Sequence, residues 1–488
     1  MLFNSIGFLI FLVIMLFIFY LCPQKYRHFV LLLGSYVFYM CWNAYLVFLI
    51  LFTTLVSYGG ALLIKKTSKE GIKKLFLIIS ITMCLGVLVF FKYINFIFAS
   101  ISDFMNMFGV SNDPIVLKLI LPVGISFYTF QTLSYVIDVY KGKIEAEKNP
   151  FYYALYVSFF PQLVAGPIER PESLLPQLKE NDRSLNHENL SKGLKIMLVG
   201  FTKKILIADC IGIYVNNIFN NIQETNSLLI IIGAILFSVQ ILCDFSGYSD
   251  IAVGTAKLFN INLMENFKKP YSSTSIKEFW NRWHISLSSW FKDYLYIPLG
   301  GNRKGNFRWA LNILIVFVVS GLWHGASYTF LIWGLMHALF QIIGKFTLSF
   351  RNKLLSLMHL NLDGFGVRIY RRVVTFLLVA LAFIAFRSNS FSDMIFAYKA
   401  LFTNFGFSMA YFSNIIEVMK ITTLGAFIIA ILIALLNVID ILKDLSFTTF
   451  WKSLLLKGAY IVLAWAIIIC FIYLQSTNVP SSFIYFQF

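Results

Sequence analysis

Apolar runs near 20 residues long recur from one end of the chain to the other, separated by short charged or Pro/Gly-rich breaks. A helix of that length crosses a hydrocarbon core roughly 30 Å thick. Because several runs are too short or too interrupted to cross, we expect about ten to twelve spanning helices. The predicted runs lie near 3–22, 29–42, 44–64, 75–100, 115–137, 151–166, 192–218, 227–258, 309–343, 370–387, 394–412, 421–440 and 454–474. The pattern predicts an all-α polytopic membrane protein.

Composition supports this prediction. The chain is 59% hydrophobic and 13% charged, whereas soluble domains carry about 25% charged residues. The formal charge of +17 comes from Lys and Arg in short loops, which indicates membrane orientation rather than nucleic-acid binding. The first apolar run has no basic residue before it and no cleavage site after it, so it reads as a retained span. Basic loops at Lys25–Arg27 and Lys65–Lys74 place the N-terminus outside the cell.

The polar residues give no sign of a soluble domain or a metal centre. The six cysteines contain no C-x-x-C pair, so neither a metal site nor a disulfide framework is expected. The chain also lacks an internal repeat. We therefore treat residues 1–488 as one integral-membrane domain, divided into N-terminal spans (1–140), a histidine-bearing core (141–345), C-terminal spans (346–474) and an aromatic tail (475–488).

The stretch between Arg308 and Lys345 contains no Asp, Glu, Lys or Arg. As one helix it would reach about 54 Å, well beyond one bilayer. The segment "SGLWHGAS" is where it can break, since non-helical backbone at membrane depth requires protein or a cavity around it. His324 in this segment is a functional candidate by default, although it could merely hydrogen-bond a neighbouring helix. His337 has a weaker claim and would suit packing or a structural hydrogen bond.

The stretch 266–308 is basic yet rich in aromatic residues. Trp280, Trp283, Leu287, Trp290 and Tyr294 recur at steps of three and four, which predicts one helix lying in the membrane interface. Structural anchoring is the simplest purpose of such a helix. His284 within it could be an interfacial histidine with its ring half in water. Two histidines also suit general-base chemistry, because a neutral imidazole accepts a proton near pH 7.

The motifs together make the chain similar to the membrane-bound O-acyltransferases, in their alginate and peptidoglycan O-acetyltransferase-like branch. The resemblance rests on "PVGISFYTFQTLSYVIDVY", "FFPQLVAGPIERP", "CDFSGYSDIAVGTAKLFNI", "NFKKPY", "FWNRWHISLSSWFKDYLYIPLGG", "SGLWHGASYTFLIWG" and the terminal "FIYFQF". It implies helices arranged around a central tunnel, with re-entrant and interfacial segments. It also implies a bacterial cell-membrane enzyme that moves an acyl group from a cytoplasmic thioester toward an exported cell-envelope polysaccharide.

The resemblance implies roles for named residues. His324 matches the family's invariant histidine and would deprotonate the accepting hydroxyl, and His284 matches the second histidine of this branch. Asn281 and Trp283 could orient the acyl group, with Trp323 and Ser327 as further substrate-binding candidates. Arg282, Lys292 and Arg303 are candidates for the donor's phosphates, although the positive-inside rule explains them equally well. Supporting roles are expected for Asp244, Asp250 and Gln131.

The tail raises a further hypothesis. Tyr485 could carry the acyl group transiently to an extracytoplasmic acetyltransferase partner of the SGNH type, although an aromatic anchor is the simpler interpretation. The expected donor is acetyl-coenzyme A, a substrate rather than a bound cofactor. Two alternatives remain open: a D-alanyl transferase of teichoic acids, which takes its acyl group from a carrier protein, and a transporter or flippase with a polar midplane site.

Overall fold

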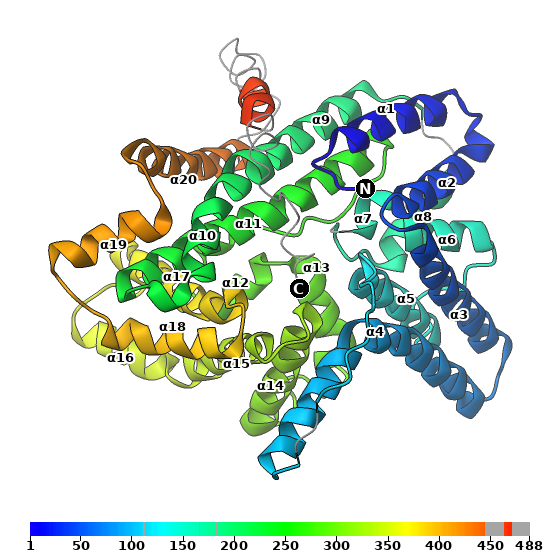
Figure 1. The fold of residues 1–488 in the computed structure, drawn as a ribbon. Coiled ribbons are helices and arrows are strands. Elements are labelled where there is room, and N and C mark those ends of the chain that lie inside the picture. Colours follow the sequence, from blue (N-terminus) through cyan, green and yellow to red (C-terminus); the bar gives the residue numbers. More distant parts are fainter. Residues whose placement is uncertain (111–112, 165, 181–183, 445–462, 471–488) are drawn as a thin grey trace. The chain divides into compact units, whose positions relative to one another are not determined.

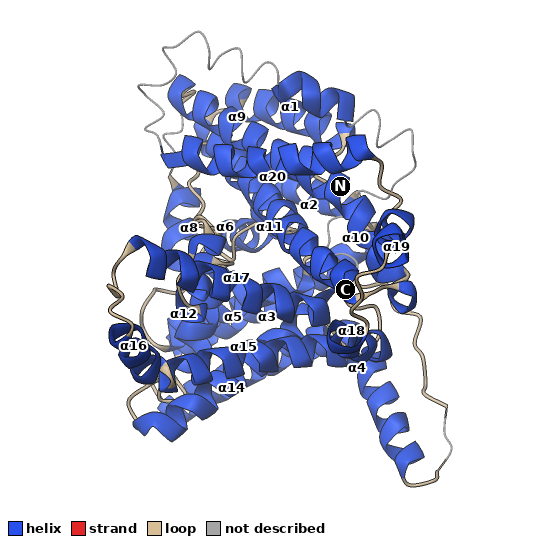
Figure 2. Ribbon diagram, turned by 90° about the vertical axis from the view of Figure 1, so that its left-hand side faces the viewer, coloured by secondary structure: helices blue, strands red, loops and turns tan. Residues whose placement is uncertain are grey.

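The computed structural model describes residues 1–488 except 111–112, 165, 181–183, 445–462 and 471–488. The described residues form helices joined by turns and loops, with no strand among them (Figure 2). The all-α prediction is confirmed, and the protein is a multi-pass membrane protein. Six described helices are long and apolar enough to cross a membrane. They are Ala44–Lys66, Glu70–Met107, Ser227–Leu258, Gly305–His324, Tyr328–Phe346 and Phe365–Arg387.

Two compact units make up the chain. The first contains residues 1–197 and 249–265, and the second contains 198–248 and 266–488. The first unit begins with α1 (Ile6–Leu21), α2 (Arg27–Met40), α3 (Val47–Lys66) and α4 (Glu70–Met107). It continues with α5 (Ile125–Tyr140), α6 (Pro150–Ser158), α7 (Phe160–Leu163), α8 (Pro171–Lys179) and most of α9 (His187–Phe201).

Helix α5 is the centre of the first unit. It packs against α3 and α4 (Figure 1), and nearly all of its side chains are buried. It starts later than the predicted 115–137 span because Gly124 has a positive φ of 75°. A side chain there would meet the carbonyl oxygen of Leu163 at 2.4 Å, so the backbone turns in a position open only to glycine.

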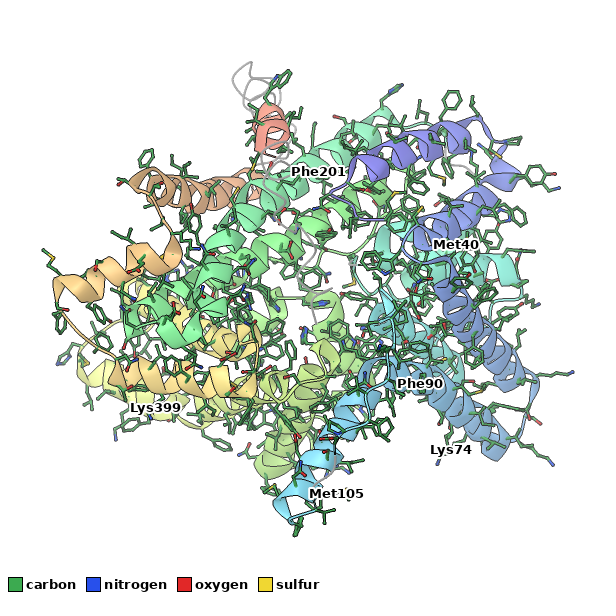
Figure 3. All side chains as sticks on the ribbon, in the orientation of Figure 1. Met40, Lys74, Phe90, Met105, Phe201 and Lys399 are labelled. Atoms are coloured by element: carbon green, nitrogen blue, oxygen red, sulfur yellow. The ribbon has the colours of Figure 1, made fainter. Side chains whose placement is uncertain are left out.

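The side chains of helix α4 are much more exposed than those of α5. Figure 3 labels Lys74, Phe90 and Met105 along its length. Phe90 and Phe104 are among its exposed apolar side chains. Only 17% of its most apolar 18-residue stretch is buried inside the protein. Exposed apolar side chains on a helix of this length suit contact with lipid.

The second unit contains the histidine motifs. Its helices include a π-helical turn (Thr202–Asp209), α10 (Cys210–Asn220) and most of α11 (Ser227–Leu258). They continue with α12 (Ile276–Arg282), α13 (Ile285–Phe291), a second π-helical turn (Lys292–Tyr296), α14 (Gly305–His324) and α15 (Tyr328–Phe346). The next helices are α16 (Leu348–Leu357), α17 (Phe365–Arg387), α18 (Phe391–Thr403), α19 (Met409–Met419) and α20 (Thr423–Asp444).

Helices α14 and α15 lie side by side with their backbones touching (Figure 1). A side chain at Gly321 would meet the Phe330 carbonyl oxygen at 2.3 Å, and one at Gly334 would meet the Phe317 carbonyl oxygen at 2.2 Å. Small residues allow this close approach in membrane helices. The contact fixes the residues between the two glycines, which include His324.

Candidate active site

The uncharged run breaks where the sequence predicts. Helix α14 ends at His324 and α15 begins at Tyr328. Ser327 caps α15, because its hydroxyl oxygen accepts a hydrogen bond from the backbone N–H of Thr329 at 3.3 Å. This bond satisfies one of the backbone donors that a helix start leaves free. His324 is therefore the last residue of a helix, and its side chain is buried.

One indole ring links the two predicted histidines. The ring centroid of Trp323 lies 5.8 Å from that of His284 and 5.0 Å from that of His324. Both contacts are edge-on, with interplanar angles of 76° and 86°. Residues from two separate sequence motifs thus meet on one aromatic side chain, in the second unit.

His284 sits in a sharp turn between α12 and α13. Its φ is 43°, a left-handed conformation that L-residues rarely adopt. Asn266 holds the turn through two hydrogen bonds, from the Ile285 N–H to its backbone oxygen at 2.9 Å and from the Ser286 N–H to its side-chain oxygen at 3.1 Å. These tertiary bonds offset the backbone strain, which is of order 1–3 kcal/mol.

The prediction of one interfacial helix across this region is wrong. The turn at His284 interrupts the helix, and Trp280, Trp283, Leu287 and Trp290 are all buried in protein. The interpretation of His284 as half in water is also wrong, because its side chain is fully buried. The Phe245 ring packs edge-on against it at 4.5 Å. This burial lowers the pKa of His284 well below its usual value, which keeps the imidazole neutral at physiological pH.

The ring contacts continue beyond His324 along α15. Trp333 lies 4.9 Å from His324, and His337 lies 5.0 Å from Trp333. Trp280 closes the series, 5.1 Å from His337, and its indole N–H donates to Nδ1 of His337 at 3.3 Å. We call these six residues the histidine–tryptophan row. In spatial order they are His284, Trp323, His324, Trp333, His337 and Trp280.

The other predicted substrate-binding residues lie outside the row. Asn281, Lys292 and Arg303 are exposed. Arg282 is half-buried, and its guanidinium donates to Glu278 at 2.6 Å and to the Ser272 hydroxyl at 3.0 Å. Trp283 stacks on Phe279 with 5.3 Å between ring centroids. Arg282 and Trp283 thus have structural partners, whereas Lys292 and Arg303 remain accessible to a ligand.

Asp244 lies in a buried ion-pair cluster of the second unit. The Lys204 Nζ is 2.5 Å from Oδ1 of Asp244 and 2.7 Å from Oδ1 of Asp209, and it lies 5.5 Å from the centre of the Tyr248 ring. Lys204 and Asp209 were not among the candidate residues predicted from the sequence. The sequence could have indicated both residues, since ionisable residues are rare inside apolar runs. Asp250 belongs to the first unit and is half-buried.

Gln131 of the first unit has a clear structural role. Its side-chain amide donates to the Tyr156 carbonyl at 2.6 Å, and that of Gln162 donates to the same oxygen at 2.8 Å. Tyr156 lies in the last turn of α6, where helix carbonyls have no partner within the helix. The two amides therefore satisfy the backbone where α6 gives way to α7.

Two remaining predictions concern the tail and metal binding. Tyr485 lies outside the described residues, so its role stays a hypothesis. Across the residues that the structure describes, no three His, Cys, Asp or Glu side chains gather in a way that could hold a metal ion.

Comparison with known proteins identifies the family. The family described as MBOAT, membrane-bound O-acyltransferase, matches residues 147–386, which include the whole row. The chain is 37% identical over 411 residues to a probable alginate O-acetylase of Pseudomonas putida, covering 83% of this chain and 80% of that protein. The chain belongs to the membrane-bound O-acyltransferase family.

Other relatives narrow the chemistry of this O-acyltransferase. It is 35% identical over 383 residues to a peptidoglycan O-acetyltransferase of Helicobacter pylori, covering 73% of this chain and 70% of that protein. A teichoic acid D-alanyltransferase of Bacillus subtilis is 32% identical over 248 residues, 47% of this chain and 60% of that protein. These matches favour an O-acyltransferase over the transporter alternative, and the likeness to the O-acetyltransferases covers more of the chain.

Proposed function

We propose that this O-acyltransferase takes an acetyl group from acetyl-coenzyme A on the cytoplasmic side of a bacterial cell membrane. It passes the group across the membrane for O-acetylation of an exported cell-envelope polysaccharide. The observation that carries the proposal is the contact of His284 and His324 with one indole, at a helix break inside an apolar run. The names of the alginate and peptidoglycan relatives support the acetyl group and the polysaccharide.

His324 is the proposed general base. It takes the proton of the accepting hydroxyl as that oxygen attacks the thioester carbonyl. The tetrahedral intermediate then collapses, the carbon–sulfur bond breaks, and the thiolate leaves. The imidazolium returns the proton to the sulfur, so the enzyme ends as it began and free coenzyme A is released. His284, whose imidazole is neutral in the turn between α12 and α13, positions the reacting groups on the other side of Trp323.

The remaining parts of the proposal concern the two sides of the membrane. Lys292 and Arg303 are exposed cations that suit the phosphates of coenzyme A. The N-terminus is proposed to lie outside. On that side an SGNH-type acetyltransferase partner would receive the acetyl group, with Tyr485 as the transient carrier.

The test uses the purified protein in liposomes with acetyl-coenzyme A labelled in the acetyl group. Free coenzyme A and label on the protein are followed for the wild type, His324→Ala, Tyr485→Phe and His187→Ala. His187 is exposed in the first unit and serves as the matched histidine control. We expect release of coenzyme A from the wild type and His187→Ala, and none above background from His324→Ala.

Three other outcomes would change the proposal. Equal release by His324→Ala and the wild type would remove His324 as the base. Normal release and partner acetylation by Tyr485→Phe would remove the relay. Turnover only with a D-alanyl carrier protein would replace the acetyl donor with the D-alanyl one.

A further inference from the structure

Two buried nitrogen atoms of the row have no hydrogen-bond partner. They are Nε1 of Trp333 and Nε2 of His337. Both side chains are almost fully buried, at 1% and 0% exposed. A buried polar group without a partner costs about 1–3 kcal/mol, and such groups in native proteins call for an explanation. Two of them lie on neighbouring rings, one turn apart on α15.

Both atoms are hydrogen-bond donors. An indole nitrogen only donates. His337 Nδ1 accepts the indole N–H of Trp280, so in the neutral imidazole the proton sits on Nε2. Each of the two N–H groups can therefore donate to a ligand atom that accepts hydrogen bonds.

The surroundings select the kind of acceptor. The rings that pack against these two side chains are those of Trp280, His324, Phe279, Phe317, Phe340 and Phe386. Moving a carboxylate or phosphate into aromatic surroundings carries a large desolvation penalty, whereas an uncharged carbonyl carries a small one. Trp333 also contacts His324, with 4.9 Å between the ring centroids, so its indole ring lies beside the proposed base.

We propose that the N–H groups of Trp333 and His337 hold the carbonyl oxygen of the acyl thioester. The inference rests on the proposed function, because the thioester is the donor assigned there. When the hydroxyl oxygen attacks the carbonyl carbon, the π electron pair moves onto the held oxygen. The two donors stabilise that charge until the pair returns and expels the thiolate. Donors already aimed at developing charge need no reorganisation during the reaction.

Trp280 is then a positioning residue. Its bond to Nδ1 fixes the proton on Nε2 of His337 and orients the ring. The two nitrogens of His337 therefore have different roles: Nδ1 binds Trp280 within the fold, and Nε2 donates to the ligand. An asparagine at position 337 retains a polar acceptor near the δ position and removes the ε donor, whereas a glutamine restores an amide donor near the ε position.

The experiment measures binding rather than turnover, with two unreactive analogues of acetyl-coenzyme A. In one, a methylene replaces the thioester sulfur, so the carbonyl remains. The other is S-ethyl-coenzyme A, in which a methylene replaces the carbonyl. Calorimetry on the full-length protein in detergent gives both dissociation constants for the wild type, His337→Asn, His337→Gln and Trp333→Phe. Trp309→Phe, on α14, is the matched control for loss of an indole.

We expect the wild type and Trp309→Phe to prefer the carbonyl analogue by about 3- to 10-fold, as one or two hydrogen bonds allow. His337→Asn and Trp333→Phe should reduce that ratio toward one while binding S-ethyl-coenzyme A as the wild type does. His337→Gln should restore part of the preference. If Trp333→Phe fails to fold, 3-benzothienylalanine at position 333 replaces the N–H with sulfur in a ring of nearly the same shape.

Several results would overturn the inference. A ratio unchanged in His337→Asn and in the position 333 variants would show that neither N–H holds the carbonyl. Equal binding of the two analogues by the wild type would do the same. Failure of the wild type to bind either analogue would remove the coenzyme A donor itself, and the proposed function with it. The first two results leave the donor in place, so the failures are distinguishable.

Discussion

Each unit contains a helix break, and the backbone groups that the two breaks leave without helical partners are satisfied differently. Where α6 ends in the first unit, the Tyr156 carbonyl receives two side-chain amides, at 2.6 and 2.8 Å. Where α14 ends in the second unit, Ser327 caps the next helix, α15. Further along α15, Trp333 and His337 have N–H groups without partners. The first break uses its donors to secure the fold. The second leaves donors available, and we infer that ligand binding uses them.

The largest expected effect separates the two breaks by activity. His324→Ala removes the proposed base, so we expect acetyl transfer to fall by about 100- to 10,000-fold. Gln162→Leu, at the other break, should leave the turnover of the folded protein within about twofold, because its amide acts on the backbone alone. Coenzyme A release, normalised to folded protein by size-exclusion chromatography, measures both. Equal losses in the two variants would contradict the division of roles.

The next effect concerns stability within the second unit. Lys204→Met removes the ammonium group that pairs with buried Asp209 and Asp244, which is expected to lower the free energy of unfolding by about 3–5 kcal/mol. The control is Lys192→Met, which removes an exposed ion pair with Glu188 and should change stability by less than about 1 kcal/mol. Denaturant unfolding in detergent compares them. Similar values for the two lysines would show that burial of the cluster contributes little.

A smaller effect sharpens the view of the first break. Gln131→Leu removes one of the two amides on the Tyr156 carbonyl, and the second remains. We expect a loss of about 1 kcal/mol, and a larger loss when Gln162→Leu is added, since the carbonyl then has neither amide. Thermal unfolding of the two single variants and the double variant tests this. A double variant no less stable than the singles would mean that the break does not depend on these bonds.

The smallest effect is a pH dependence in the loop that follows α7. Burial raises the pKa of Glu169 to about 7, above its usual value near 4.5. The folded state therefore binds a proton that the unfolded state has released, and this contribution to stability declines as pH rises from about 4.5 to about 7. Glu169→Gln should flatten that slope. Melting temperatures between pH 4.5 and 8 check it, and a slope unchanged in the variant would assign it to another group.

The sequence predicted the break in the second unit because its evidence was local. No single helix could hold the uncharged run between Arg308 and Lys345 within one bilayer. The turn at His284 could not be predicted in the same way, because Asn266 imposes it from outside the helical pattern. The hydrogen bond of His337 to Trp280 could not be predicted for a related reason: Trp280 lies in another motif, and periodicity carries no information on such tertiary contacts.

The candidate site, too, was predicted only in part from the sequence. The sequence placed His324 and His284 among the candidates, and the structure brings both to Trp323. Asn281, by contrast, was chosen for its nearness in sequence to His284 and turned out to be exposed. Asn281 lies on α12, whereas His284 lies in the turn that follows it, so nearness in sequence was a poor guide there.

The alternation of imidazole and indole rings has a spectroscopic consequence. A protonated imidazole accepts an electron from an excited indole and quenches its emission, whereas a neutral imidazole does so far less. Three of the nine tryptophans belong to the row, each touching at least one histidine. In the proposed mechanism His324 takes up the hydroxyl proton, and the emission of Trp323 and Trp333 is then expected to fall together. It is expected to recover when the imidazolium returns the proton to the departing thiol.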